Sequence, residues 1–126
     1  EPGVGRTASA ITDWLTSLPG LDASAPEPVT VGGLPGFSVD LTLAAAWTHG
    51  CDYSDGKPIV STFVDSDDSA EGFDWNVGAV GKVRYIILDL GDGRALLIDI
   101  EVADIADFDG LVADAMPVIG TFTFRK

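Results

Sequence analysis

The feature that most constrains the fold of this chain is the stretch KVRYIILDLGDGRALLIDIEV, residues 82–102. Two apolar runs rich in β-branched residues flank the sequence Gly91-Asp92-Gly93. Glycines at these positions permit the positive φ angles of a tight turn, so the pattern predicts a β-hairpin. No other part of the chain is so apolar over such a length, and we expect this hairpin to lie at the centre of a sheet.

Two registers of this hairpin fit the sequence. A two-residue loop, Gly91-Asp92, aligns three pairs of opposite charge, each worth up to ~1 kcal/mol. The pairs are Asp89–Arg94, Arg84–Asp99 and Lys82–Glu101. A three-residue loop with a glycine bulge loses these pairs but collects a larger apolar set on one face, namely Ile86, Leu88, Leu90, Leu96, Ile98, Ile100 and Val102. Burial of each large side chain contributes ~1.5–3 kcal/mol, so we favour the bulged form. Both faces are apolar in either register, which predicts a sheet covered on both sides.

The composition indicates one folded domain with an acidic surface. The chain has 126 residues, of which 46% are hydrophobic, and a formal net charge of −13. This length is typical of one domain, which we assign to residues 9–126, with residues 1–8 as a linker or processed end. The negative charge repels nucleic-acid phosphates and anionic lipid headgroups, so we expect neither as a partner. No apolar run approaches the ~20 residues that a membrane-spanning helix needs, and we expect no direct membrane insertion.

The first half of the domain predicts a helix followed by a second hairpin. A cap at Thr7 or Ser9 begins the helix, and Pro19-Gly20 ends it. Its apolar stripe consists of Ile11, Trp14, Leu15 and Leu18. After a polar connection, LDASAPEP, residues 29–31 and 37–43 form the arms of the hairpin around Gly32-Gly33-Leu34-Pro35-Gly36. Strict alternation in the second arm indicates a half-buried strand.

The second half predicts an irregular middle, a helix and a last strand. Between residues 44 and 79, we expect short strands at 59–64 and 73–77. After the central hairpin, Asp104 or Asp107 caps a helix that Pro117 should end or kink. Its apolar residues, Phe108, Leu111, Val112, Ala115 and Met116, keep helical spacing. Residues 121–124, Thr-Phe-Thr-Phe, alternate as a closing strand. The fold class is therefore α+β, a mainly antiparallel sheet with an N-terminal and a C-terminal helix packed on it.

Three phrases carry a resemblance to known domains: VTVGGLPGFSVDLTL, ILDLGDGRALLIDIE and FDGLVADAMPVIGTFTF. They resemble uncharacterised bacterial domains that are extracytoplasmic or attached to regulatory proteins. The sheet that ends in a helix and a short "sFxF" strand is also similar to the PsbP-like class of lipoproteins and accessory proteins. This resemblance implies a PsbP-like sandwich and a binding or accessory role without a catalytic set. It assigns no functional residue.

An acidic segment in the middle of the chain is a candidate metal site. Asp65, Asp67, Asp68 and Glu71 cluster there, followed by Asp74, and hard cations such as calcium prefer clustered carboxylates. An EF-hand loop starting at Asp65 requires Gly at its sixth and Glu at its twelfth position. Ala70 and Asn76 stand there instead, so that motif fails. A looser calcium site competes with a simple solvated acidic loop, which we favour.

The chain contains few residues that could serve in nucleophilic catalysis. His49, Cys51 and Asp52 contain the residue types of a thiol nucleophile and its base, but neighbours in sequence rarely point at each other as catalysis requires. His49 is the only histidine and Cys51 the only cysteine, so neither an internal disulfide nor a cysteine-based zinc site can form within the chain. Phosphate-binding loops and serine-hydrolase motifs are absent from the sequence. We expect no enzyme, no catalytic residue and no cofactor.

Aromatic residues among the glycines and carboxylates of the middle are the best candidates for ligand binding. They are Trp47, Tyr53, Phe73 and Trp75. Flat rings beside hydrogen-bonding carboxylates suit a sugar or an apolar ligand. The competing interpretation, which we favour, is that Trp47 and Trp75 fill the sheet edge and the helix seam.

We therefore expect a non-catalytic interaction or accessory module with its working surface in residues 47–77. The alternative is a small-ligand (sugar) or calcium-binding domain that uses the same region. A protein partner or an upstream domain is expected, with the protein extracytoplasmic, at the cell surface or secreted. Alternatively it is cytoplasmic, as part of a larger regulatory protein.

Overall fold

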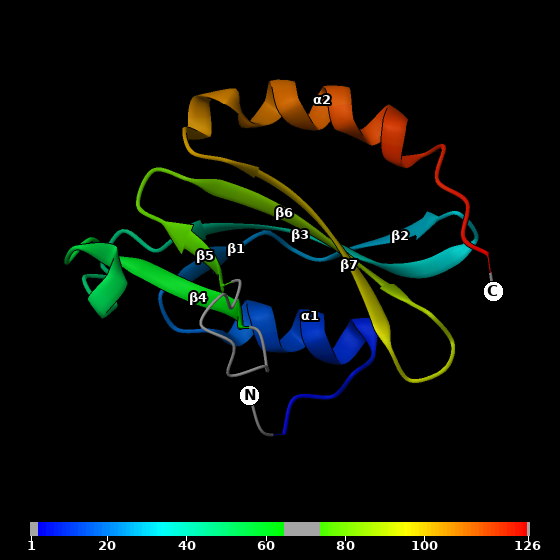
Figure 1. Ribbon diagram of the computed structural model, residues 1–126, viewed down its shortest axis with the longest axis horizontal. Helices are drawn as coiled ribbons and strands as arrows, with labels where there is room; N and C mark the ends of the chain where they lie inside the picture. The colour runs from blue at the N-terminus through cyan, green and yellow to red at the C-terminus, as the bar shows by residue number, and fades with distance from the viewer. Residues whose placement is uncertain (1–2, 65–73, 126) are drawn as a thin grey trace.

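The computed structural model describes residues 3–64 and 74–125 (Figure 1). The fold is α+β, with a mainly antiparallel sheet and one helix near each end of the chain, as predicted. The elements follow in the order α1 (Ala8–Ser17), β1 (Leu21–Ala23), β2 (Glu27–Val31), β3 (Leu34–Leu43), β4 (Ile59–Val64), β5 (Asp74–Gly78), β6 (Lys82–Asp89), β7 (Ala95–Val102) and α2 (Phe108–Ile119), with short 3-10 turns at Asp52–Ser54 and Ile105–Asp107.

The main sheet has five strands and lies between two covering layers. The long strand β3 pairs with β1 and β2 along one side and with β6 along the other, and β7 pairs with β6. In Figure 1, α2 lies over one face of this sheet, whereas α1 and the β4–β5 hairpin lie over the opposite face. Each face carries its own apolar core, one around Tyr85 and Leu15 and one around Ile86 and Ile119. The prediction of a sheet covered on both sides is confirmed.

The β6–β7 hairpin adopts the bulged register. Ile86 lies opposite Ile98 and Leu88 opposite Leu96, so their side chains share the face under α2. The amide of Leu90 donates to the carbonyl of Arg94 at 3.0 Å and closes a three-residue loop. Gly91 and Gly93 have φ angles of 81° and 79°, which side chains rarely adopt. The favoured prediction is confirmed, because burial of a continuous apolar row outweighs exposed charge pairs.

The first helix forms as its cap predicts. The Thr7 hydroxyl accepts a hydrogen bond from the amide of Ala10, and the helix starts at Ala8, whose side chain is already fully buried. The amide of Ala8 also donates to the Asp89 carboxylate at 2.8 Å, which joins the helix to the end of β6. The beginning of the helix is therefore fixed both by its own cap and by the sheet.

The first hairpin is tighter and longer than predicted. Only Gly32 and Gly33 form its loop, with φ angles of 55° and 82°, so Leu34–Gly36 belong to β3 and not to the turn. The segment LDASAPEP is not only a connection, because β1 lies within it and β2 begins at Glu27. A side chain at Gly36 would collide with the backbone of Ile87, so this strand position requires glycine.

The middle of the chain builds the second covering layer. β4 and β5 pair with each other at the two places where short strands were predicted, in a two-stranded sheet of their own. Their register shifts between Ser61 and Phe63, and the intervening Thr62 is buried. Its hydroxyl donates to the carbonyl of Trp75 and lies 2.7 Å from the hydroxyl of Tyr85. The irregularity thus fastens this layer to the main sheet.

The C-terminal segment differs from the predictions in two respects. Of the two outcomes predicted for Pro117, an end of the helix does not occur: the helix continues to Ile119, and the amide of Gly120 donates to the carbonyl of Met116 at 2.9 Å. Residues 121–124 do not form a closing strand. The half-buried Phe124 packs on the core under α2 beside Gly32, and Phe122 is 38% exposed. The alternating pattern of these four residues therefore reflects the burial of one phenylalanine and not the pairing of a strand.

Candidate binding cleft

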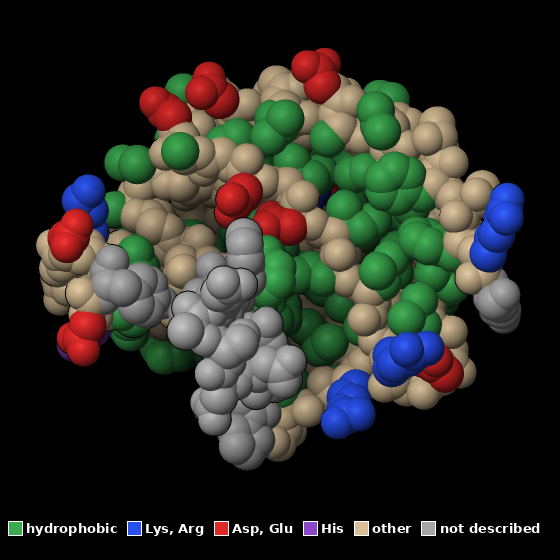
Figure 2. All heavy atoms as spheres, in the orientation of Figure 1, with side chains coloured by type: hydrophobic (Ala, Val, Ile, Leu, Met, Phe, Trp, Pro, Cys, Tyr) green, Lys and Arg blue, Asp and Glu red, His purple; other side chains and the backbone are tan. Residues whose placement is uncertain are grey.

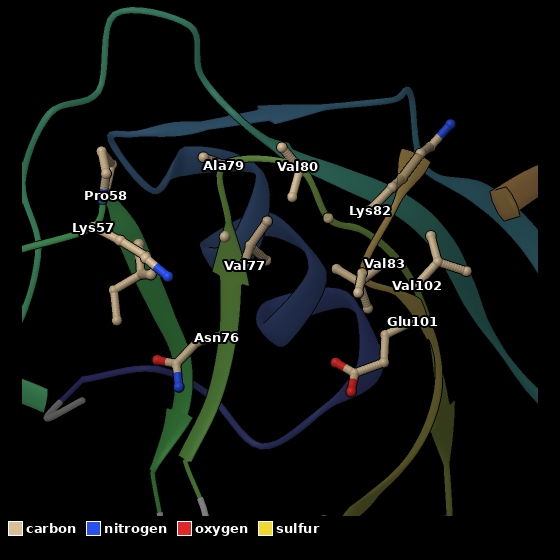
Figure 3. Close-up of a pocket in the computed structure, with 14 residues that line it drawn as sticks. Lys57, Pro58, Asn76, Val77, Ala79, Val80, Lys82, Val83, Glu101 and Val102 are labelled. Carbon is tan, nitrogen blue, oxygen red and sulfur yellow. The ribbon is translucent and has the colours of Figure 1, made fainter. Parts of the chain in front are cut away.

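A cleft of about 570 Å³ opens between the β4–β5 hairpin and the main sheet (Figure 3). One wall consists of residues 57–59 and 76–78, at the start of β4 and the end of β5. The other wall consists of the start of β6 and residues 101–103 at the end of β7. The size lies within the range of pockets that hold small molecules or single side chains of a partner.

The lining of the cleft is largely apolar. Val77 and Val83 are buried in the core beneath it, and they make the cleft continuous with the apolar interior of the domain. The remaining apolar side chains are those of Pro58, Ile59, Ala79, Val80, Val102 and Ala103. Val80 is 69% exposed, the most exposed large apolar side chain among the described residues.

Opposite charges stand on the two walls of the cleft. Figure 3 shows Lys57 on the hairpin wall and Glu101 on the sheet wall, and neither forms an ion pair within the described part of the chain. Lys82 also lines the cleft, but its amino group points away, toward Asp40 at 3.7 Å and the ring of Phe108 at 4.1 Å. The carboxamide oxygen of Asn76 accepts a hydrogen bond from Ser61. The cleft therefore offers an apolar floor between one cation and one anion.

The turn that connects the walls is held by backbone hydrogen bonds. The amide of Gly81 donates to the carbonyl of Gly78 at 3.2 Å, and the amide of Ile105 donates to the carbonyl of Val80 at 2.9 Å. The second bond joins the floor of the cleft to the segment that leads into α2. These bonds fix the backbone of Val80 while its side chain stays exposed.

Trp47 supports the hairpin wall from behind. Its indole nitrogen donates to the carbonyl of Ile59 at 2.9 Å, and the carbonyl of His49 accepts from the amide of Ile59 at 3.0 Å. The ring also packs so closely on Gly20 that any side chain there would collide with it. Trp47 is half-buried and does not line the cleft. It therefore supports a wall of the cleft and is not part of its lining.

The other predicted ligand-binding aromatics do not form a shared platform with Trp47. Trp75 is half-buried in β5, opposite Phe63, and does not line the cleft. The side chain of Tyr53 and all of Phe73 lie outside the described residues. The same is true of the predicted calcium ligands Asp65, Asp67, Asp68 and Glu71. Across residues 3–64 and 74–125, three or more His, Cys, Asp or Glu residues nowhere gather in an arrangement that could hold a metal ion.

His49 and Cys51 make separate contacts in the structure. The imidazole of His49 packs edge-on against the ring of Trp47, with 4.7 Å between ring centroids. The amide of Cys51 donates a hydrogen bond to the hydroxyl of Ser54 at 3.0 Å. Within the described residues, no hydrogen bond joins the thiol to the imidazole.

Asp99 is a half-buried carboxylate beside the cleft, and the sequence did not predict it as a site residue. Asp99 is two residues before Glu101 on the same face of β7, and it lies opposite Tyr85. Its Oδ1 atom is buried and has no hydrogen-bond partner among the described residues. Burial, together with the smaller effect of the negative charge of Glu101, raises the pKa of Asp99 to about 6. An acidic residue within an apolar strand is the sequence signal, but the strand alone does not reveal whether the carboxylate is buried.

A second cavity, of about 650 Å³, lies between the N-terminal residues 4–6, α1, the end of β4 and the start of β7. One of its walls is a chain segment without regular structure, so its shape depends on the course of that segment. The cleft of Figure 3 is bounded by strands on both sides, and we therefore base the site on it.

Comparisons with known proteins add no family. No family model matches the chain, and searches of curated proteins and of solved structures found no match. Neither of the two described helices is long and apolar enough to cross a membrane. Functional inference therefore depends on the geometry of the cleft and its surroundings.

Proposed function

We propose that this domain is a non-catalytic interaction module whose cleft receives an apolar group of a partner or ligand. The observation that carries this proposal is the cleft itself, an apolar floor continuous with the core and open to solvent beside an exposed valine. Apolar clefts with a few polar groups at the rim are the usual form of binding sites. The described residues that line the cleft include no Ser, Thr, Cys or His.

The charges at the rim indicate the chemistry of the occupant. A group that combines an apolar body with a carboxylate near Lys57 or an ammonium near Glu101 would satisfy both the floor and one wall. A bare sugar fits less well, because its hydroxyls need more hydrogen-bonding partners than these walls provide. We therefore favour an amphipathic ligand or side chain over the sugar alternative.

The experiment is a screen of small amphipathic fragments by NMR, observed at the methyl groups of Val77, Val80, Val83 and Val102. We expect fragments with one apolar ring and one charged group to shift these four signals together. Substitution Val80→Asp should abolish the shifts, because it places a charge on an exposed part of the floor. The matched control is Val118→Asp on α2, where Val118 is 59% exposed and lies outside the cleft. Binding that survives Val80→Asp, or no shift with any fragment, would overturn the proposal.

The extracytoplasmic location and the PsbP-like resemblance remain predictions. Fractionation of cells that produce the whole protein tests the first, with exclusive recovery in the cytoplasm as the contradicting result. The native mass of the protein recovered from the same fractions tests whether it carries an upstream domain or a bound partner.

A further inference from the structure

The two long edges of the main sheet differ in how they are closed, and the difference reveals a second interaction surface. One edge consists of the short strands β1 and β2, interrupted by residues 24–26. The other edge is β7, eight residues without interruption and without proline or lysine. Within the described residues, β7 has a partner strand on one side only. Figure 1 looks onto this edge, with β7 in front.

The backbone groups that β7 offers can be assigned from the turn. The hydrogen bond from Leu90 to Arg94 marks an inward-bonded pair, and such pairs alternate along an antiparallel ladder. Leu96, Ile98 and Ile100 therefore direct their backbone groups toward β6. Ala95, Leu97, Asp99 and Glu101 direct their N–H and C=O groups outward. These are the groups that a further strand would use.

The side chains along this edge select the occupant by charge and polarity. On the face toward α2, β7 presents the apolar row Leu96, Ile98 and Ile100. On the other face it presents Leu97, Asp99 and Glu101. Asp99 lies opposite Tyr85 there, and the charge that acts on its pKa is that of Glu101. Figure 2, in the same orientation, shows hydrophobic side chains gathered over this side of the molecule below α2. An added strand would continue both rows.

We propose that the edge of β7 binds an extended segment of a partner protein as an antiparallel strand, with Lys or Arg opposite Asp99 and Glu101 and apolar residues between them. Cross-strand pairs of opposite charge stabilise such a ladder, whereas like charges oppose it. A second copy of this chain is excluded as the occupant at neutral pH. A two-fold pairing of β7 strands would bring four carboxylates onto one face, and each copy has a net charge of −13. The inference shares Glu101 with the cleft but goes beyond the proposed function, because it uses the outward backbone groups of β7 and Asp99, which does not line the cleft.

The experiment measures binding of the synthetic peptide acetyl-TKVRVITS-amide to the whole chain by fluorescence anisotropy at low salt. In the expected alignment, the peptide's Lys lies opposite Glu101 and its Arg opposite Asp99. We expect saturable binding at pH 7.5 that weakens as the pH falls through about 6, where Asp99 takes up a proton. The acidic peptide acetyl-TEVDVITS-amide should not bind. Equal binding of both peptides, or no binding of the basic one, would overturn the proposal.

Two matched pairs separate strand addition from mere charge attraction. The double substitution Asp99→Asn with Glu101→Gln should weaken binding about tenfold, since two cross-strand charge pairs contribute together ~1.4 kcal/mol. The control pair Asp22→Asn with Glu27→Gln removes the same charge from the opposite edge and should leave binding unchanged. An equal loss in both pairs would mean nonspecific attraction and would contradict the proposal.

N-methylation of the peptide tests the backbone ladder directly. A methyl group on the amide of the peptide's Arg removes a donor that faces β7 and should abolish binding. The same methyl group on the second Val faces away from β7 and should be tolerated. The cleft variant Val80→Asp should keep full affinity for the peptide, so failure of the cleft and failure of the edge are distinguishable. Tolerance of both methyl groups would overturn the proposal.

Discussion

The two edges of the main sheet are protected against unwanted strand pairing in different ways. Along β1 and β2, the chain itself closes the edge, with strands of three and five residues and Pro28 in the second of them. Short strands and prolines are common means of blocking unwanted pairing. Along β7, the strand is long and apolar, and only Asp99 and Glu101 oppose pairing. Protection by chain geometry is permanent, whereas protection by charge is lifted by a partner of opposite charge.

Ser24 shows how closely the first edge is fitted to its neighbour. Its amide donates to the carbonyl of Asp40 at 2.9 Å, and its hydroxyl accepts from the amide of Asp40 at 3.0 Å. A side chain thus replaces a strand at the interruption between β1 and β2. Nothing comparable occupies the outward groups of β7 within the described residues.

The largest effect on the free energy of unfolding should come from the packing of β7. This strand lies at the edge of the sheet, but the side chains on one of its faces are part of the core. Ile100 is only 5% exposed and packs with Ile86 and Ile119 under α2. Substitution Ile100→Ala should lower the free energy of unfolding in urea by about 3 kcal/mol, through lost burial and a cavity. The exposed Thr30 on the other edge is the control, and Thr30→Ala should cost less than ~1 kcal/mol. Similar losses at both positions would remove the distinction between the edges.

A smaller change in the free energy of unfolding, an increase instead of a decrease, is expected when Asp99 is replaced. Because its pKa is about 6 in the folded protein and ~3.9 when unfolded, the folded state favours the protonated form. The resulting stability is present below pH 4 and is lost as the pH rises through about 6. Substitution Asp99→Asn should therefore raise the free energy of unfolding at pH 7.5 by about 1 kcal/mol, allowing for partial solvent screening, and should have little effect below pH 4. Urea unfolding at a series of pH values measures the difference, and a pH-independent difference would contradict the assigned pKa.

The smallest effect is expected at the closed edge. Substitution Ser24→Ala removes an exposed hydrogen bond to the amide of Asp40, and water can replace it in part. The free energy of unfolding should fall by only about 0.5–1 kcal/mol. Hydrogen exchange sharpens the comparison, because the amide of Asp40 should exchange faster in the variant while the amides of β6 keep their protection. Unchanged exchange at Asp40 would show that Ser24 does not close this edge.

Local sequence patterns predicted most of the elements and one register. The glycines around Asp92 specify the loop, and the alternating apolar rows of β6 and β7 specify which loop length buries them, so the central hairpin was predictable. The Thr7 cap and the following apolar stripe likewise predicted α1. The closing strand failed for a related reason. The alternating pattern of residues 121–124 indicates which side chains can be buried. It does not indicate whether a neighbouring strand is available for pairing.

The candidate site was much less predictable than the fold. The sequence directed attention to the region around Trp47 and Trp75, and the hairpin wall of the cleft does come from this region, in residues 57–59 and 76–78. The aromatic residues themselves do not line the cleft. Its other wall, including Glu101, comes from strands that appeared to be scaffold only. Residues from separate layers meet there, and no local pattern encodes such a meeting.

The sequence by itself determined the α+β class, the central hairpin and the net negative charge, because each follows from short-range periodicity, glycine conformations or simple charge. It favoured the bulged register of that hairpin but left a second register open. Tertiary structure alone decided that the β4–β5 hairpin forms a second layer, fastened by the contact between Thr62 and Tyr85. It also decided that Asp99 is half-buried and that β7 has an open edge. Burial and strand order depend on contacts between residues far apart in the chain, and these contacts exist only once the layers have assembled.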